Sequence, residues 1–178
     1  MNERTRGKDG NYWFEQLCAG LRPDLYRFAF WLSRDRQVAE DVVQEALLRA
    51  WKSRDRLTDP AAAKPWLLTI VRREHARLYE RKRFETVPVD ELVSRDDPAL
   101  AASEDRATLD LRRAIFALEE QYREPLVMQV LLGLSTQEIA DQLGLTQRAV
   151  LTRLFRARNR LRVAMGLEAV DDAADDDE

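Results

Sequence analysis

Arginine concentrates in one stretch near the end of the chain. Between Thr146 and Arg162 there are six arginines and no aspartate or glutamate. A helix that stabilises its own arginines by ion pairs needs acids one turn away, and this stretch has none. A guanidinium group can donate two parallel hydrogen bonds to guanine or bind a backbone phosphate. This composition therefore favours contact with nucleic acid.

A second basic stretch lies earlier in the chain. Residues 49–83 hold eleven Lys or Arg against four Asp or Glu. The acids collect elsewhere, in FETVPVDELVSRDDPALAASED and in the final EAVDDAADDDE. The formal net charge of −3 excludes a uniformly basic protein. Two basic stretches separated by an acidic connector predict two DNA-facing surfaces.

Residue types that catalyse reactions or bind metals are scarce. His75 is the only histidine, so the side chain that most often acts as a general base occurs once. Cys18 is the only cysteine, so no internal disulfide can form. No His, Cys or carboxylate cluster has ligand spacing, so we expect neither a metal site nor another cofactor. We interpret His75 as a surface helix residue and Cys18 as a core residue. The sequence predicts a protein that is not an enzyme.

The pattern of apolar residues predicts helices that carry these basic stretches. Only 6 glycines and 6 prolines occur among 178 residues, and 45% of the residues are apolar, which indicates an all-α protein with a core. Apolar residues recur at helical spacing in 11–33, 36–53 and 66–85. Pro23 is expected in the first turn of a second helix within 11–33. Residues 57–65, LTDPAAAKP, are expected to form a loop.

The helical pattern lapses in the middle of the chain and then resumes. The sequence predicts two small helical domains, 10–84 and 108–165. Prolines and acids between them predict an acidic flexible linker at 85–107. The final segment, 166–178, is expected to be an acidic disordered tail.

The second domain contains a helix-turn-helix pattern. Ser135 or Thr136 can cap the helix QEIADQL, with Glu138 completing a capping box. Gly144 suits the left-handed residue that ends this helix, and Thr146 can cap the next one. The N-terminal part of that second helix would enter the major groove. The alternative is a structural helix with a solvated arginine face.

Three motifs together resemble a known family. AEDVVQEALLRAWKS, KPWLLTIVRREHAR and LEEQYREPLVMQVLLGLSTQEIADQLGLTQRAVLTRLFRARNRLR occur in the order and at the separation found in bacterial RNA polymerase sigma factors of the extracytoplasmic-function (ECF) group. The resemblance covers about residues 12–163. It implies that residues 10–84 are sigma domain 2 and residues 108–165 sigma domain 4.

The resemblance also implies roles for particular residues. Binding to the clamp helices of the largest polymerase subunit falls to Asp41, Gln44, Glu45, Leu48 and Arg49. Recognition and melting of the −10 DNA fall to Asp59, Lys64, Trp66, Arg72, Arg73, Arg77, Arg81, Lys82 and Arg83. Recognition of the −35 DNA falls to Gln147, Arg148, Leu151, Thr152, Arg153, Phe155, Arg156 and Arg158.

The chain departs from the family pattern in three places. Arg73 stands where many relatives have asparagine, and the loop at 57–65 is rich in alanine. Leu151 stands where lysine or arginine is common, which predicts one fewer charged contact with the −35 DNA.

Trp51 and Trp66 are interpreted as core anchors, although Trp66 also lies beside the loop and can support a pocket for a flipped base.

The partners implied are core RNA polymerase, with its clamp helices and flap, promoter DNA, and an inhibitory anti-sigma factor. No apolar run is long enough to span a bilayer and no signal peptide is evident, so we expect a cytoplasmic protein without membrane insertion. Two alternatives are a conventional helix-turn-helix regulator that binds DNA alone and a protein that only sequesters a partner. The polymerase-binding motif argues against the first, and the two arginine clusters argue against the second.

Overall fold

The structure is a computed structural model that describes residues 3–84 and 106–169. For residues 3–11 and 81–84 it describes the backbone alone. The predicted linker lies outside the described residues except for its last two positions, which begin a helix. Most of the predicted tail also lies outside them.

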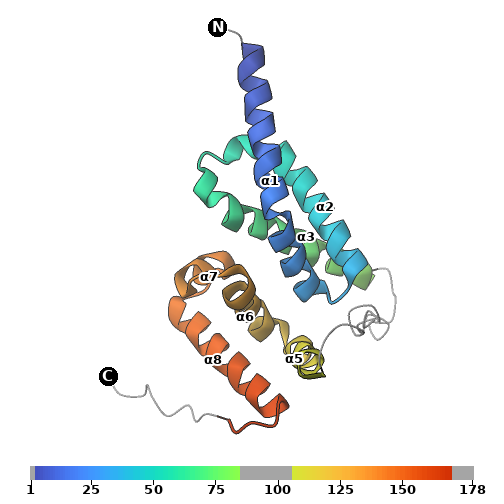
Figure 1. Ribbon diagram of the computed structural model, residues 1–178, viewed down its shortest axis with the longest axis vertical. Coiled ribbons are helices and arrows are strands. Elements are labelled where there is room, and N and C mark those ends of the chain that lie inside the picture. Colours follow the sequence, from blue (N-terminus) through green and yellow to red (C-terminus); the bar gives the residue numbers. More distant parts are fainter. Residues whose placement is uncertain (1–2, 85–105, 170–178) are drawn as a thin grey trace. The chain divides into compact units, whose positions relative to one another are not determined.

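The chain divides into two compact units, Met1–Ser94 and Arg95–Glu178. In the described part of the chain, the regular elements are α-helices, with two short 3-10 helices in the first unit (Figure 1). The predicted all-α class, with two small helical domains, is therefore confirmed. The exact domain limits stay predictions.

The first unit is a packed group of helices. Its described residues form α1 (Glu3–Ser33), α2 (Arg36–Lys52) and α3 (Ala63–Phe84), and each of these packs against the other two. Two 3-10 turns, η1 (Arg54–Arg56) and η2 (Pro60–Ala62), connect α2 to α3. The expected loop thus contains a short turn of helix directly before the basic helix.

Apolar side chains at helical spacing form the core of the first unit. The buried members are Phe14, Leu25, Phe28, Ala29, Leu32, Ala39, Val42, Val43, Ala46, Ala50, Ala63, Leu67, Leu68 and Val71. The rings of Trp51 and Trp66 lie 6.0 and 6.4 Å from the ring of Phe14, which is 2% exposed. Both tryptophans are half-buried, so they cover the edge of the core and hold the loop end of the unit together.

The expected break at Pro23 was wrong, because α1 continues through this residue. Proline cannot donate to the carbonyl of Ala19, and inside a helix it usually costs about 3 kcal/mol. Here both Pro23 and Ala19 are exposed, so water can bind that carbonyl. On the opposite side Leu25 and Phe28 are fully buried. Packing of this apolar face against α2 and α3 therefore outweighs the local cost.

The interpretation of His75 as a surface residue was also wrong. Its side chain is 5% exposed, and its ring lies 4.7 Å from the ring of Tyr79 one turn later. Glu74 beside it is also buried. Because α3 packs against both α1 and α2, a wider face of this helix is buried than its apolar residues alone would cover.

Cys18 is half-buried on α1, and burial raises the pKa of its thiol to about 11. The thiolate is the nucleophile in alkylation, so the folded protein should react slowly with iodoacetamide at pH 8. Unfolding in urea brings the pKa back towards roughly 8.5 and should raise the rate by about two orders of magnitude. A time course by mass spectrometry measures both rates, and equal rates would contradict the burial of this thiol.

The second unit consists of shorter helices. Its described residues form α5 (Arg106–Ala117), α6 (Glu120–Leu132), α7 (Thr136–Leu143) and α8 (Gln147–Ala164). The helices α5, α6 and α7 all contact α8 (Figure 1). The buried apolar residues are Phe116, Leu118, Tyr122, Leu126, Val127, Met128, Leu132, Leu134, Ile139, Ala140, Val150, Leu154 and Ala157.

Candidate partner and nucleic-acid interfaces

The residues assigned to polymerase binding form one exposed stripe on α2. They are Asp41, Gln44, Glu45, Leu48 and Arg49, at helical positions i, i+3, i+4, i+7 and i+8, and all of them are exposed. Leu48 is 50% exposed, although it is a large apolar residue. The opposite side of α2 carries its buried valines and alanines. We refer to these five exposed residues as the α2 stripe.

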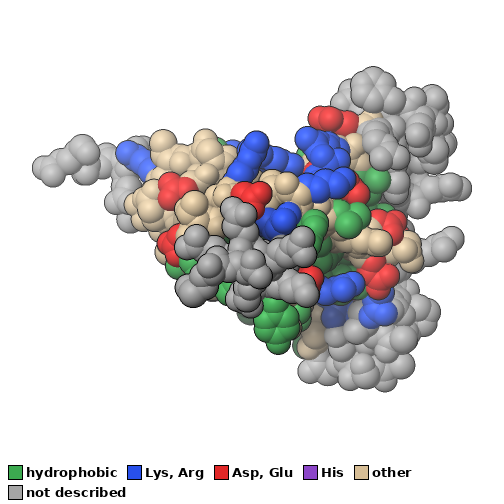
Figure 2. Space-filling model, turned by 90° about the horizontal axis from the view of Figure 1, so that it is seen from above, with side chains coloured by type: hydrophobic (Ala, Val, Ile, Leu, Met, Phe, Trp, Pro, Cys, Tyr) green, Lys and Arg blue, Asp and Glu red, His purple; other side chains and the backbone are tan. Residues whose placement is uncertain are grey.

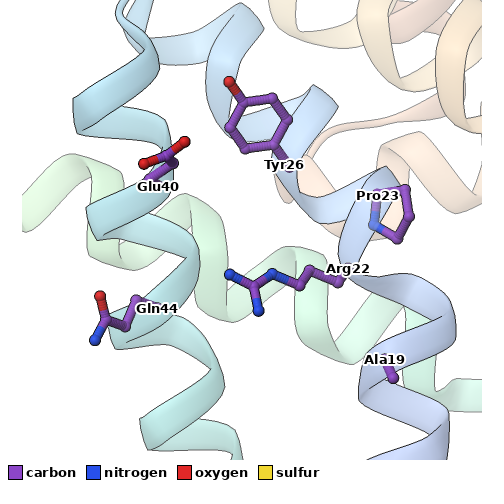
Figure 3. A pocket seen from close by; sticks show the side chains of 6 residues that line it. All are labelled: Ala19, Arg22, Pro23, Tyr26, Glu40 and Gln44. Carbon is purple, nitrogen blue, oxygen red and sulfur yellow. The ribbon is translucent and has the colours of Figure 1, made fainter.

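A groove between α1 and α2 adjoins the α2 stripe. It has a volume of about 450 Å³ and is lined by Ala19, Arg22, Pro23, Tyr26, Glu40 and Gln44. Figure 3 shows Arg22 extending from α1 towards α2, with Tyr26 on the same wall and Glu40 and Gln44 on the other. Sequence reasoning missed the α1 wall, because its polar residues carry no motif. Gln44 therefore belongs to both the stripe and the groove.

The loop before α3 is held by contacts within the first unit. Asp59 caps η2, since its Oδ1 accepts a hydrogen bond of 2.9 Å from the N–H of Ala61. Lys64 lies at the start of α3, and its Nζ is 2.8 Å from Oδ2 of Asp24 on α1. Together with the ring contact of Trp66, these interactions fix the loop and leave the side chains of Ala61 and its neighbours exposed.

The basic residues of α3 are only partly brought together. Arg73 and Arg77 are exposed one helical turn apart, whereas Arg72 is half-buried. The side chains of Arg81, Lys82 and Arg83 lie outside the described residues, although their backbone continues α3. Figure 2 shows Lys and Arg side chains (blue) and Asp and Glu side chains (red) close to one another on the face in view.

The helix-turn-helix of the second unit forms at the predicted positions. Ser135 and Glu138 make the full capping box at the start of α7. Gly144 ends α7 with φ 65° in the left-handed region, which favours glycine. Thr146 caps α8 by accepting a 3.2 Å hydrogen bond from the N–H of Ala149. Thr136 also accepts a hydrogen bond of 2.8 Å from Nε2 of the Gln147 side chain. These local contacts fix the turn between the two helices.

Four of the residues assigned to the −35 DNA follow one side of α8. Arg148, Leu151, Thr152 and Arg156 are exposed at positions i, i+3, i+4 and i+8, and Leu151 is 53% exposed. The other assigned residues differ in their surroundings. Gln147 and Arg158 are exposed, and Arg153 and Phe155 are half-buried. The hydroxyl of Thr152 donates a hydrogen bond of 3.0 Å to the carbonyl of Arg148.

Two arginines of α8 bind within the second unit. Arg160 lies 4.2 Å above the ring of Tyr122, and its Nη1 is 2.6 Å from Oε1 of Glu119. The hydrogen bond from this guanidinium holds the pKa of the Glu119 carboxyl below its ordinary value, and it raises the pKa of Arg160. Arg158 donates to the side-chain oxygen of Gln129 on α6. Two of the arginines in the stretch without acids are therefore engaged in contacts within the second unit.

Arg123 is a structural residue that the sequence did not reveal. Its side chain is 4% exposed, and Nη1 donates hydrogen bonds of 2.7 Å to the carbonyl of Leu118 and 3.3 Å to that of Phe116. These carbonyls lie at the end of α5, where a helix leaves acceptors without backbone partners. A cation there also interacts favourably with the helix dipole.

Two properties of the described residues bear on other functions. Among the described residues, no group of three or more His, Cys, Asp or Glu side chains is placed to hold a metal ion. None of the helices within 3–84 and 106–169 combines the length and the apolar character required to cross a membrane.

Comparison with known proteins gives matches over both units. Residues 17–85 match the family described as Sigma-70 region 2, and residues 108–161 match Sigma-70, region 4. The chain is 33% identical to the ECF RNA polymerase sigma factor SigL of Mycobacterium tuberculosis over 145 residues, which cover 79% of this chain and 82% of SigL. It is 31% identical to the sigma factor CarQ of Myxococcus xanthus, covering 86% and 89% of the two chains.

Other similar proteins extend the comparison. The probable sigma factor RfaY of Xanthomonas campestris is 34% identical, but the match spans only 39% of its length and 84% of this chain. The sigma factor RpoE of Bartonella quintana, solved with the anti-sigma factor NepR, aligns with a TM-score of 0.72 and 27% identity over 86% of this chain and 96% of RpoE. CnrH, solved with the cytosolic domain of CnrY, aligns with a TM-score of 0.62, also at 27% identity, over 86% of this chain and 87% of CnrH. With both sigma regions matched on the two helical units described above, the chain belongs to the ECF RNA polymerase sigma factors.

Proposed function

We propose that this chain is a dissociable sigma subunit that binds core RNA polymerase and directs it to promoters through their −10 and −35 elements. One observation carries the proposal. A single chain of this family presents an exposed mixed stripe on α2 and an arginine-bearing helix-turn-helix in a separate unit. The chemistry of RNA synthesis belongs to the polymerase, so the role requires no catalysis by this chain. This proposed role implies that the protein acts in the cytoplasm, where the polymerase is.

The α2 stripe is the proposed contact with the clamp helices of the polymerase. It offers hydrogen-bonding groups and both signs of charge around the exposed Leu48. Interfaces of this kind combine an apolar centre with a polar rim. The adjoining groove adds Arg22 and Tyr26 from α1, which can receive a side chain from the partner.

Replacing Gln44 and Glu45 together by alanine should weaken binding to core polymerase about ten-fold, because the two substitutions remove polar contacts near the centre of the stripe. The measurement is the Kd for core polymerase with the labelled full chain. A matched control is Glu15→Ala with Gln16→Ala on α1, which also removes one exposed carboxylate and one exposed amide that are adjacent in sequence but belong to neither the stripe nor the groove lining. An unchanged Kd for the α2 variant would refute the assignment of this face.

The loop at 57–65 and the basic side of α3 are the proposed −10 site. Melting requires a place for the freed base and cations for the displaced strand. The exposed Arg73 and Arg77 supply cations on α3, and Arg81, Lys82 and Arg83 would extend them along the same helix. The capped, tightly held loop offers a rigid edge at which a base can be captured.

The outer side of α8 is the proposed −35 reader. Arg148 and Arg156 can bond base edges or phosphates, and Thr152 and Leu151 can contact a thymine methyl group. The exposed Leu151 replaces a charged contact by an apolar one. Arg158 also contributes, in competition with its hydrogen bond to Gln129. Contact of this unit with the polymerase flap completes the proposed assembly.

We also propose that an anti-sigma factor holds the free protein inactive. RpoE and CnrH, which align with most of this chain, were each solved bound to another protein, and NepR in the first complex is an anti-sigma factor. The α2 stripe and the side of α8 are exposed in the chain alone, so a partner that covers them would block polymerase and DNA together.

The decisive experiment mixes the purified chain with bacterial core RNA polymerase, first for a comigrating complex and then for promoter-dependent transcripts. A stable complex with selective initiation supports the proposal. Specific DNA binding by the chain alone, without a polymerase complex, would instead support a conventional helix-turn-helix regulator. The match to Sigma-70 region 2 disfavours that alternative.

A further inference from the structure

A buried carboxylate links the α2 stripe to the basic side of α3. Glu74 lies on α3 with its side chain 7% exposed. Its Oε1 is 2.8 Å from Nε of Arg49 on α2 and 2.9 Å from Nη1 of Arg77 on α3. Nε of Arg49 also lies 3.1 Å from Oε1 of Glu45. Four groups of alternating charge, Glu45, Arg49, Glu74 and Arg77, therefore run from one proposed interface to the other.

The burial of Glu74 makes these pairs more than ordinary surface contacts. Exposed ion pairs order their side chains weakly, because water competes for both charges. A buried carboxylate is costly without cationic partners, so it holds the arginines that neutralise it. Arg49 and Arg77 remain 44% and 54% exposed. Each guanidinium group is thus fixed on its inner side and accessible on its outer side.

The shared oxygen also brings two like charges together. Without the carboxylate between them, the guanidinium groups of Arg49 and Arg77 would repel each other. If Glu74 were neutral, each arginine would turn towards water and sample several rotamers. A side chain that is ordered before binding loses less entropy when its partner arrives.

We propose that Glu74 is a positioning residue that orients Arg49 for core polymerase and Arg77 for the −10 DNA. This inference rests on the proposed function, because it needs the α2 stripe to bind polymerase and α3 to bind DNA. Glu74 itself is too buried to contact either partner. Its role is to hold one residue of each interface through a single carboxylate.

The test is a pair of double-mutant cycles on the full chain. Glu74→Gln keeps the size of the side chain and removes its charge. We expect roughly a five-fold loss of affinity for core polymerase and, at saturating polymerase, roughly a five-fold loss of open complexes at a cognate promoter. In an Arg49→Ala background the substitution should cause no further loss of core affinity. In an Arg77→Ala background it should cause no further loss of open complexes.

The matched control is Glu80→Gln, which removes a carboxylate from an exposed position of the same helix and should change neither quantity. A residue that only stabilised the fold would give losses that add in both backgrounds, and this result would overturn the positioning role. So would full activity of Glu74→Gln. If this variant does not fold, as judged by thermal unfolding, Glu74→Asp takes its place in the same cycles with the same criteria, because it keeps the charge and withdraws it from both arginines.

The proposed function fails in a different way. Unchanged core affinity of Arg49→Ala alone would remove both the role of this residue at the polymerase and its positioning by Glu74. A loss for Arg49→Ala together with an additive loss for Glu74→Gln would overturn the positioning role alone.

Discussion

Replacing Arg156 by alanine should lower transcription from a cognate promoter about ten-fold while leaving the affinity for core polymerase unchanged. Arg156 is exposed on the outer side of α8, two turns from Arg148. A two-pronged contact of arginine with a base contributes about 1–3 kcal/mol of discrimination, and a phosphate contact contributes a salt-dependent part of the affinity. The substitution removes either contact without touching the buried side of the helix.

The measurement is promoter-dependent transcription by the reconstituted polymerase at several salt concentrations, with core affinity determined in parallel. Arg162→Ala is the matched control, because it removes the same charge from the last turn of α8, where Arg162 donates to the carbonyl of Glu168. A similar loss in both variants would mean that net charge matters and the position does not. Undiminished transcription by Arg156→Ala would remove it from the reading face.

Replacing Arg123 by methionine should destabilise the second unit by about 3 kcal/mol. The substitution leaves the carbonyls of Phe116 and Leu118 without their buried donor, and such groups cost about 1–3 kcal/mol each. Methionine fills much of the volume of the arginine side chain, so the loss of stability reflects the lost hydrogen bonds more than a new cavity. A unit of this size has a total stability of roughly 5 kcal/mol, so a measurable fraction should unfold at 37 °C.

Hydrogen exchange read by mass spectrometry localises this effect in the full chain. Peptides from α5 and α6 should lose protection in Arg123→Met, whereas peptides from α1, α2 and α3 should keep it. Arg106→Met is the control, because this side chain is 96% exposed and lies 3.9 Å from its acidic neighbour Asp110. Equal protection of α5 in both variants would show that the buried hydrogen bonds do not stabilise the unit.

Local signals in the sequence were sufficient for the helix-turn-helix. Ser135, Glu138, Gly144 and Thr146 act on backbone groups within a few residues, so their types and spacing predict the geometry directly. The α2 stripe could also be predicted from the sequence, because helical periodicity alone separates its members from the buried valines. These parts of the fold depend on short-range chemistry.

The remaining features depend on contacts between helices. Pro23 was expected to start a helix, but the buried side of α1 keeps the helix continuous. His75 and Arg123 are polar residues that packing buries, and no periodicity of apolar residues reveals them. Glu74 had no assigned role, because its partner Arg49 lies 25 residues away on another helix. Roles of individual residues at the interfaces stay predictions.

In α8, the residues that hold the helix in place differ from those on its exposed side, and this separation affects how such a protein can diverge in evolution. Val150, Leu154 and Ala157 anchor the helix in the core, and Arg160 fixes its far end through Tyr122 and Glu119. The exposed Arg148, Leu151, Thr152 and Arg156 have no part in this anchoring. Under the proposed function, substitutions at these positions can therefore change which promoter is read at little thermodynamic cost. After gene duplication, one copy can acquire a new regulon by a few surface changes while the scaffold is inherited intact.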